Sequence, residues 1–282
     1  MARDKELTGR VAWISGGASG MGLASGIRLA EMGASVAIGS LTQELAAGRI
    51  NENQRAFTPA HDRLEIARKA IAEHGGKTYA APLDITDPAS VEENHAAITA
   101  ELGPVDILIN AAGNSGRSTI VDHPDSLWNA MLEVNLTGSY RMTRTCLPGM
   151  IERGWGRVVM FSSTAGLVGA ELHGAYCAAK HGLLGLMKCV ALEGAAHGVT
   201  CNAICPGWVA SEQNVLGVSQ EAEMLGLDVS VEEYRAMMAE KWIPQKRFLT
   251  PDEPGAYVAF LCSEGARGVT GEALKVTGGS MW

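Results

Sequence analysis

The sequence predicts an α/β fold, a doubly wound parallel sheet with helices on both faces. Short β-branched apolar runs alternate with longer stretches of helical period, which is the pattern of a parallel sheet covered on both sides. Apolar residues make up 46% of the 282 residues, enough to fill a core of that size. A glycine-rich turn follows the first apolar run and opens a helical stretch. We therefore expect one domain over residues 1–282.

Seven strands and at least six helices are expected. The last helix should have Thr250 as its N-cap and Pro251 as its first helical residue. Proline suits that position because the N–H it lacks would have no acceptor within the helix. The expected strands are residues 11–14, 35–38, 78–82, 105–109, 157–161, 200–204 and 273–276, and the expected helices are residues 20–32, 61–74, 88–102, 126–153, 175–197 and 251–262.

Two segments interrupt this alternation. Residues 42–60 are polar and contain glycine, and residues 211–247 include an amphipathic stretch at 231–241. Neither segment is long enough to form a core of its own, so we interpret both as insertions into the one domain. The second, placed between the sixth strand and the last helix, is expected to be a substrate lid.

Charge and apolar run lengths exclude several classes of partner. The 23 Lys and Arg against 31 Asp and Glu give a formal charge of −8, which argues against binding to nucleic acid or to an anionic membrane. The longest apolar runs are far shorter than the roughly 20 residues that cross a bilayer. The charged N-terminus lacks the pattern of a secretory signal, so we expect a cytoplasmic location.

The cysteines do not indicate a disulfide framework or a metal site. The sequence has 6 cysteines, none in C-x-x-C spacing, and no H-E-x-x-H motif accompanies them. We expect buried free thiols and no transition metal.

The glycine turn after the first strand predicts a phosphate site. Residues 15–22 read Ser-Gly-Gly-Ala-Ser-Gly-Met-Gly. Glycines there allow a tight turn and a close approach of backbone N–H groups, so a pyrophosphate can bind at the helix N-terminus. The spacing differs from Gly-x-Gly-x-x-Gly, and no Gly-Lys-Ser/Thr follows it, which excludes a P-loop. An ordinary strand-to-helix turn is the alternative.

A serine, a tyrosine and a lysine predict proton transfer. Ser163 follows the fifth strand, where an open α/β sheet presents side chains to its crevice, and Tyr176 and Lys180 follow at helical i, i+4 spacing. The ammonium should favour the ionised phenol and lower its pKa, so that the phenol exchanges a proton with an alcohol or a carbonyl. A surface helix pair is the alternative.

With these motifs the chain resembles the short-chain dehydrogenase/reductase family from about residue 7 to 282, which implies a Rossmann fold. The resemblance implies Tyr176 as acid/base, Ser163 as hydrogen-bond partner of the substrate oxygen, and Lys180 as activator of the tyrosine and ribose ligand. It also implies that Asn135 supports a proton-relay water, and that the protein is a homotetramer. The residues that carry the resemblance are Ser15, Gly16, Gly20, Gly22, Asp84, Asn110, Ala111, Ala112, Gly113, Asn135, Ser163, Tyr176, Lys180, Pro206 and Gly207.

The same resemblance assigns a dinucleotide cofactor. Neither an acidic residue for NAD nor an arginine for NADP follows the second strand, where the chain has Ser40 and Leu41. The lack of a nearby basic residue favours NAD, although Arg49 or Arg55 could reach a 2′-phosphate. The implied cofactor positions are Gly16, Ser19, Gly20, Met21 and Gly22 at the pyrophosphate, Ser40, Leu41, Asp84 and Ile85 around the adenosine, Asn110, Ala111, Ala112, Gly113, Tyr176 and Lys180 near the ribose, and Pro206, Gly207, Val209 and Ser211 near the nicotinamide.

The substrate positions resemble those of 3-hydroxybutyrate dehydrogenases only in part. Ser115 and Ala165 stand where that subgroup has a Gln and a His, and His173 stands where it has a Lys. Arg117 is a candidate anion ligand, because a guanidinium binds a carboxylate or sulfonate at two points, and a solvated loop arginine is the alternative. The other candidates for substrate contact are His173, Trp208, Gln213 and Asn214.

Together these patterns predict an NAD-dependent oxidoreductase that interconverts a secondary alcohol and a ketone. The substrate is expected to be a small polar or anionic molecule, such as a hydroxy acid, a polyol or a sulfonated alcohol. An NADPH-dependent ketoreductase for a bulkier or carrier-bound substrate is the alternative enzyme. A non-catalytic nucleotide-binding scaffold is the alternative from another class.

Overall fold

A parallel sheet lies at the centre of the computed structural model, which describes residues 5–46, 58–212, 214, 217–219, 222 and 226–280. Within these residues 7 strands pair in the order β3-β2-β1-β4-β5-β6-β7, all parallel, which confirms the predicted fold class. The strands are β1 (Val11–Ser15), β2 (Ser35–Ser40), β3 (Thr78–Pro82), β4 (Ile107–Asn110), β5 (Gly156–Phe161), β6 (Val199–Pro206) and β7 (Ala273–Val276).

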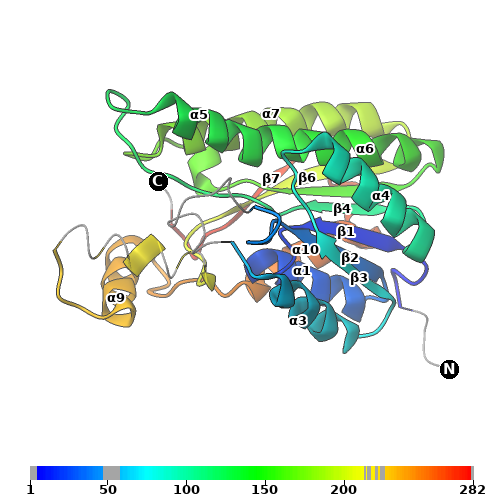
Figure 1. Ribbon diagram of the computed structural model, residues 1–282, viewed down its shortest axis with the longest axis horizontal. Coiled ribbons are helices and arrows are strands. Elements are labelled where there is room, and N and C mark those ends of the chain that lie inside the picture. Colours follow the sequence, from blue (N-terminus) through cyan, green and yellow to red (C-terminus); the bar gives the residue numbers. More distant parts are fainter. Residues whose placement is uncertain are drawn as a thin grey trace.

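Both faces of the sheet are buried under helices (Figure 1). In β1, Ala12 and Ile14 pack into the core on one face, while Val11 and Trp13 pack into the core on the other. Such strands are apolar at every position, which is why the sequence shows runs and no alternation. One face is covered by α1 (Gly20–Glu31), α3 (His61–Ala72) and α10 (Asp252–Cys262), and the other by α4 (Pro88–Leu102), α6 (Ser139–Glu152) and α7 (Gly174–Ala195). The shorter helix α5 (Asp125–Leu132) packs against α7.

The long helix expected at residues 126–153 is interrupted. A π-helical segment, Glu133–Gly138, separates α5 from α6, so the prediction of one regular α-helix was wrong. A π turn inserts one residue per turn and rotates the side chains that follow, which the 3.6-residue period cannot reveal. The buried Asn135 lies in this segment.

The start of the last helix also differs from the prediction. Pro251 is the N-cap and α10 begins at Asp252, one residue later than expected. The carboxylate of Glu253 accepts a hydrogen bond from the Thr250 backbone N–H at 2.8 Å and receives another from the Thr250 hydroxyl at 3.4 Å. The side chain of Glu253, in the first turn of α10, therefore bonds Thr250. The Thr250 side chain does not cap the helix.

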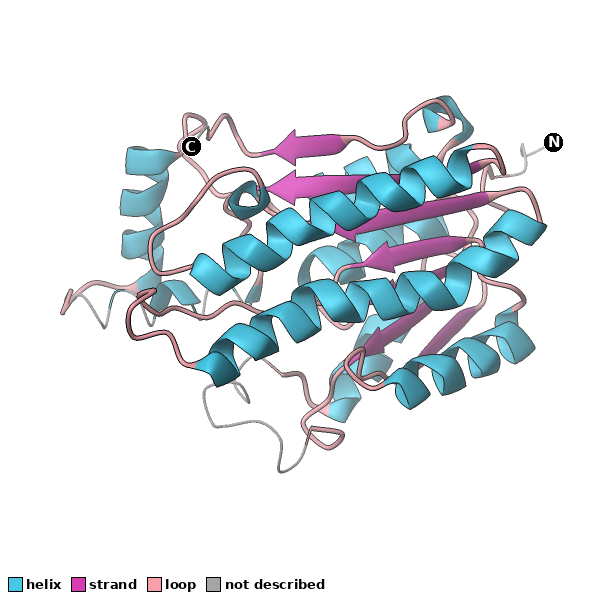
Figure 2. Ribbon diagram, turned by 90° about the horizontal axis from the view of Figure 1, so that it is seen from above, coloured by secondary structure: helices cyan, strands magenta, loops and turns pink. Residues whose placement is uncertain are grey.

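The strand order reverses between β1 and β4, and this reversal locates the binding crevice. Chains that leave β1 and β4 diverge to opposite faces, which opens a crevice at the carboxyl ends of these strands. Figure 2 shows all the strands pointing to the same end, where α9 (Val231–Trp242) lies. The amphipathic stretch predicted at 231–241 is therefore a helix, and it stands at the catalytic end of the sheet.

Other sequence expectations concern cysteines and membrane spans. All six cysteines are described and are free thiols, five of them buried, whereas Cys189 is exposed, contrary to expectation. No helix in the described part of the chain has both the length and the apolar composition that a bilayer crossing needs.

Candidate active site

The glycine turn is built by backbone contacts that leave no room for side chains. The N–H groups of Gly16 and Gly17 both donate to the Gly39 carbonyl, at 2.7 and 3.2 Å. Gly16 has φ +71°, and a Cβ there would lie 2.8 Å from the backbone of Ala112. The turn therefore lies in close contact with Gly39 of β2 and with Ala112 after β4. This close approach, together with the positive φ, requires glycine at position 16.

The start of α1 is equally tight. A Cβ on Gly22 would lie 2.3 Å from the Gly16 carbonyl oxygen, so the helix begins directly under the turn. Gly20 has φ +53°, and a Cβ there would lie 3.4 Å from the Cβ of Ser211, the residue at which the second insertion begins. The implied pyrophosphate positions, including Ser19 and Met21 at the same helix start, thus lie at the mouth of the crevice, in a cradle that side chains would fill.

Ser163 and Tyr176 come together from two elements. Ser163 follows β5, and its hydroxyl accepts a hydrogen bond from the Ala165 backbone N–H at 3.1 Å, which fixes the side chain at the carboxyl end of the strand. Tyr176 lies in the first turn of α7, and it is hydrogen-bonded to Ser163. A substrate oxygen placed beside this pair would meet a hydroxyl and a phenol together.

Lys180 lies one helical turn after Tyr176. Its side chain is 5% exposed, its Nζ donates to the Phe161 carbonyl at 2.8 Å, and Nζ lies 5.6 Å from the centre of the Tyr176 ring. Burial lowers the pKa of Lys180 to about 8. The ammonium is therefore held by the end of β5, below the phenol.

The expected lowering of the Tyr176 pKa is not found. Burial raises the pKa of this phenol, and the hydrogen bond with Ser163 offsets only part of that effect. Lys180 points its ammonium at the Phe161 carbonyl, and the sequence spacing could not show how deeply the phenol is buried.

The buried lysine predicts a pH-dependent stability. Lys180 has a pKa of about 8 when folded against an ordinary 10.5, so between these values the unfolded chain binds more protons and stability rises with pH. Relative to Lys180→Met, the wild type should gain about 2 kcal/mol from pH 7 to pH 9.5. Urea unfolding of both proteins at the two pH values measures this gain, and a constant difference between them would contradict it.

Asn135 is held so that one atom stays available. Its Nδ2 donates to the carbonyl of Asn114 at 3.0 Å, to the side-chain oxygen of Asn114 at 2.9 Å and to the carbonyl of Met131 at 3.1 Å. Its Oδ1 is buried without a hydrogen-bond partner in the described structure. A Cβ on Gly113 would lie 2.8 Å from this oxygen and 3.5 Å from Lys180 Nζ. Asn135 and Lys180 thus flank Gly113.

The adenosine positions lie at the ends of β2 and β3. The Ser40 hydroxyl accepts a hydrogen bond from the Ala18 N–H at 3.1 Å, and Leu41 follows it, half-buried. Asp84 is buried, and its Oδ1 accepts hydrogen bonds from Thr86 N–H at 2.9 Å and from Thr86 Oγ1 at 2.6 Å. Ile85, also buried, follows Asp84. Arg49 and Arg55 lie outside the described residues.

The ribose and nicotinamide positions lie at the ends of β4 and β6. Asn110 ends β4, and its Nδ2 donates to Thr143 Oγ1 at 3.2 Å while its Oδ1 is buried without a partner in the described structure. Ala111 and Ala112 continue from it to Gly113. After β6, the Gly207 N–H donates to the Val276 carbonyl at 2.9 Å, and the Ser211 N–H donates to the Val209 carbonyl at 2.8 Å. These positions fit a dinucleotide laid across the strand ends, and Pro206 is the last residue of β6.

Two loops that carry substrate candidates are joined at the mouth. The Ser118 N–H donates to the Leu172 carbonyl at 2.9 Å, which ties the loop with Ser115 and Arg117 to the loop before α7. The His173 ring lies 6.3 Å from the Tyr176 ring, edge to face. Ser115 and Arg117 are exposed, whereas Ala165 is buried beside Ser163.

The remaining substrate candidates lie at the base of the lid. Trp208 follows β6, and its ring lies tilted against that of Phe248 with ring centres 5.9 Å apart. The Asn214 N–H donates to Ser211 Oγ at 3.2 Å, and its Oδ1 is buried without a partner in the described structure. Gln213 lies outside the described residues.

Sequence reasoning missed the residues that support the catalytic candidates. The Ser162 hydroxyl donates to the Lys180 backbone carbonyl at 3.1 Å, and its oxygen would be 2.3 Å from a Cβ on Gly166. Asn114 accepts from the Asn135 amide group at both its carbonyl and its side-chain oxygen, as described above. Ser162 precedes Ser163 directly, so adjacency to a candidate was the one signal that could have found it.

Comparisons with known proteins agree with this geometry. A family model described as enoyl-(acyl carrier protein) reductase matches residues 53–281. D-β-hydroxybutyrate dehydrogenase of Cupriavidus necator is 37% identical over 277 residues, which cover 97% of this chain and 98% of that protein. The 2-(S)-hydroxypropyl-CoM dehydrogenase 3 of Xanthobacter autotrophicus is 33% identical over 273 residues, with 97% of each chain covered.

A solved structure shares both the fold and the sequence similarity. A variant of actinorhodin polyketide ketoreductase, crystallised with NADPH, superposes with a TM-score of 0.85 at 33% identity, covering 96% of each chain. The chain therefore belongs to the short-chain dehydrogenase/reductase family and is an oxidoreductase of the class that acts on CH–OH groups with NAD(P).

Proposed function

We propose that this protein is an NAD-dependent oxidoreductase that interconverts a secondary alcohol and a ketone on a small polar or anionic substrate. The observation that carries the proposal is the meeting of Ser163, Tyr176 and the buried Lys180 at the strand ends, beside the glycine turn. A phenol hydrogen-bonded to a hydroxyl, with an ammonium one turn away, suits proton exchange at a carbon-bound oxygen.

Each of the four side chains has a distinct task in this proposal. Tyr176 takes the proton from the alcohol oxygen, or returns it to the carbonyl oxygen, while Ser163 donates a hydrogen bond to the same oxygen. Lys180 places positive charge below the phenol when its ammonium is not neutralised, which offsets the cost of burying a phenolate. Asn135 holds a water through its free Oδ1, and that water connects Lys180 with solvent.

The cofactor is held by the glycine turn and the strand ends. The nicotinamide, when bound, supplies or accepts the hydride at the substrate carbon. The absence of a side chain at the turn lets the pyrophosphate reach the start of α1. Leu41 follows Ser40 where a 2′-phosphate would need a cation, which favours NAD over NADP.

A second candidate is an NADPH-dependent ketoreductase for a bulkier substrate. The rim beside α7 carries exposed apolar side chains, because Ile120 is 71% exposed, Val121 92% and Leu172 38%. Ile120 touches Gly174, the first residue of α7, so this apolar rim borders the Tyr176 end of the crevice. An apolar rim favours a substrate with an extended acyl or polyketide chain.

Cofactor titration followed by a substrate screen tests the two candidates. NADH and NADPH are titrated separately against the purified protein by fluorescence, and hydroxy acids, polyols and sulfonated alcohols are then screened with the preferred oxidised cofactor. The proposal expects tighter binding of NADH and turnover of an anionic alcohol. Preference for NADPH with reduction of thioester ketones would establish the ketoreductase, and binding of neither cofactor would leave a scaffold.

A further inference from the structure

The first residues of the lid pass close to the start of α1. A Cβ on Gly20 would lie 3.4 Å from the Cβ of Ser211. Ser211 is fixed there by two hydrogen bonds, because its N–H donates to the Val209 carbonyl at 2.8 Å and its Oγ accepts from the Asn214 N–H at 3.2 Å. The start of a helix is where a phosphate binds, so this part of the lid lies beside the expected position of the pyrophosphate.

An ion pair joins this part of the lid to α3. Glu212 follows Ser211 directly, and its carboxylate accepts a hydrogen bond from the guanidinium of Arg63, in the first turn of α3. Because α3 connects the parallel strands β2 and β3, it runs against their direction and begins at their carboxyl ends. Figure 1 shows the start of α3 on the side of the sheet where α9 lies. The ion pair therefore stands at the end of the sheet that carries the crevice.

The start of α3 is also tied to the chain that leaves β2. The Gln43 N–H donates to the Pro59 carbonyl at 3.0 Å, and the Gln43 Nε2 donates to the Thr58 carbonyl at 3.0 Å. The implied adenosine positions at the end of β2 precede Gln43 closely. Arg63 thus belongs to the adenosine side of the crevice, whereas Glu212 follows β6 and belongs to the nicotinamide side.

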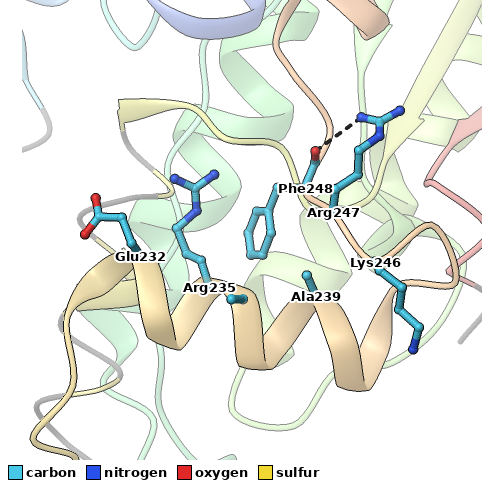
Figure 3. Close-up of a pocket in the computed structure, with 7 residues that line it drawn as sticks. Glu232, Arg235, Ala239, Lys246, Arg247 and Phe248 are labelled. Carbon is cyan, nitrogen blue, oxygen red and sulfur yellow. Dashed lines mark hydrogen bonds between the residues drawn. The ribbon is translucent and has the colours of Figure 1, made fainter.

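The far end of the lid is attached differently, by apolar packing. The Phe248 ring lies against the Trp208 ring, which follows β6, with ring centres 5.9 Å apart. Figure 3 shows the Phe248 ring against α9, beside Arg235, whose guanidinium lies 4.8 Å from the ring centre. Buried side chains of α9, among them Tyr234 and Met238, pack into the same apolar cluster. This attachment gains its stability from burial, which salt does not screen.

The ion pair is the weaker of the two attachments. The Arg63 side chain is 39% exposed and the Glu212 side chain 68%, and an exposed ion pair contributes little stability and is screened by salt. Within the described residues, each of the two has the other as its single ion-pair partner. The start of the lid can therefore separate from α3 while α9 stays in place.

We propose that the Arg63–Glu212 ion pair is a strap that closes the start of the lid over the phosphate cradle and slows the release of the bound dinucleotide. The inference goes beyond the proposed function, because it concerns the departure of the cofactor and no property of the substrate. With the pair intact, residues 211–212 stay beside the start of α1. Arg63 also neutralises the Glu212 carboxylate, which would otherwise repel the pyrophosphate.

The dissociation rate of the dinucleotide tests the strap. NADH, or NADPH if the titration prefers it, is displaced by excess oxidised dinucleotide and followed by stopped-flow fluorescence. Arg63→Gln and Glu212→Gln should each raise the rate about 2- to 5-fold, as expected for the loss of one exposed ion pair. The double variant should release the dinucleotide no faster than either single variant, because both substitutions remove the same link.

Exchange of the two charges tests the pair directly. Arg63→Glu sets two carboxylates against each other and should release the dinucleotide faster than Arg63→Gln does. Adding Glu212→Arg to Arg63→Glu should bring the rate back to within about 2-fold of the wild type, since the pair is then rebuilt in reverse. An exchanged protein that stays as fast as Arg63→Glu would contradict the strap.

A second arginine of the same helix is the matched control. Arg68 is 32% exposed and pairs with Glu65 of α3 itself, so it links no part of the lid. Arg68→Gln removes the same charge and should leave the dissociation rate unchanged. An equal acceleration in Arg68→Gln would reduce the effect of Arg63 to general electrostatics and overturn the strap.

Two other outcomes separate the strap from its rivals. If Arg63 bound the phosphates itself, Glu212→Gln would free it and tighten dinucleotide binding, and this result would reject the strap. Binding of neither dinucleotide would reject the strap together with the proposed function. Normal turnover in both glutamine variants, with release as slow as in the wild type, would reject the strap alone.

Discussion

Replacing Tyr176 by phenylalanine should lower turnover about 10²- to 10⁴-fold, the range that one acid/base group contributes. The substitution removes only the phenolic oxygen, and the half-buried ring keeps its place in the first turn of α7. Ser163 would still bond the substrate oxygen, but no group at that position could exchange its proton. Steady-state rates in both directions, with the substrate found by the screen, measure the effect.

NADH binding supplies the internal control for this variant. The affinity of Tyr176→Phe should stay within a few-fold of the wild type, because the glycine turn and the strand ends are untouched. Tyr257→Phe, at a side chain of α10 that is 41% exposed, should leave turnover unchanged. Retained turnover in Tyr176→Phe would remove this residue from the proposed mechanism.

Replacing Gly22 by alanine should weaken NADH binding about 10- to 100-fold, the equivalent of a typical 1–3 kcal/mol overpacking cost. The new Cβ would lie 2.3 Å from the Gly16 carbonyl oxygen, a backbone atom of the turn itself. The start of α1 must then move away from the turn, which misplaces the N–H groups expected to bind the pyrophosphate. Fluorescence titration with NADH measures the loss.

A second glycine controls for the helix context. Gly185 lies in α7, and a Cβ there would meet nothing within 4 Å. Gly185→Ala should leave NADH binding unchanged and stabilise the fold by about 0.5–1 kcal/mol, because alanine is the better helix former. Thermal unfolding of both variants shows whether Gly22→Ala still folds, and normal NADH binding by a folded Gly22→Ala would contradict the expectation.

The sequence predicted the strands and the glycine turn correctly because the fold imposes a recognisable local pattern on these residues. Val11 and Trp13 face one core and Ala12 and Ile14 the other, so a run of apolar residues marks a strand buried on both faces. Glycine spacing located the turn for the same reason, since the close approaches around Gly16 and Gly22 exclude other residues. Patterns of this kind involve only residues that are consecutive in the sequence.

Other features depend on contacts between distant segments. The π turn around Asn135 was not visible in the apolar periodicity, and two of the three hydrogen-bond acceptors of that side chain belong to Asn114, in the loop after β4. The pKa of Tyr176 was expected to fall, but it rises because the folded chain removes water from the phenol. No spacing rule reports the depth at which a side chain is buried.

The sequence by itself determined the parallel α/β architecture, the family and the residues expected to carry proton transfer and to bind the dinucleotide. Only the tertiary structure decided that the Lys180 ammonium is held by the Phe161 carbonyl and that the Ser162 hydroxyl bonds the Lys180 backbone carbonyl. Hydrophobic periodicity and glycine turns depend on residues that are close in the sequence, so the sequence alone reveals them. Hydrogen bonding and desolvation depend on neighbours that folding brings from elsewhere in the chain, and these set the charge and the selectivity of the site.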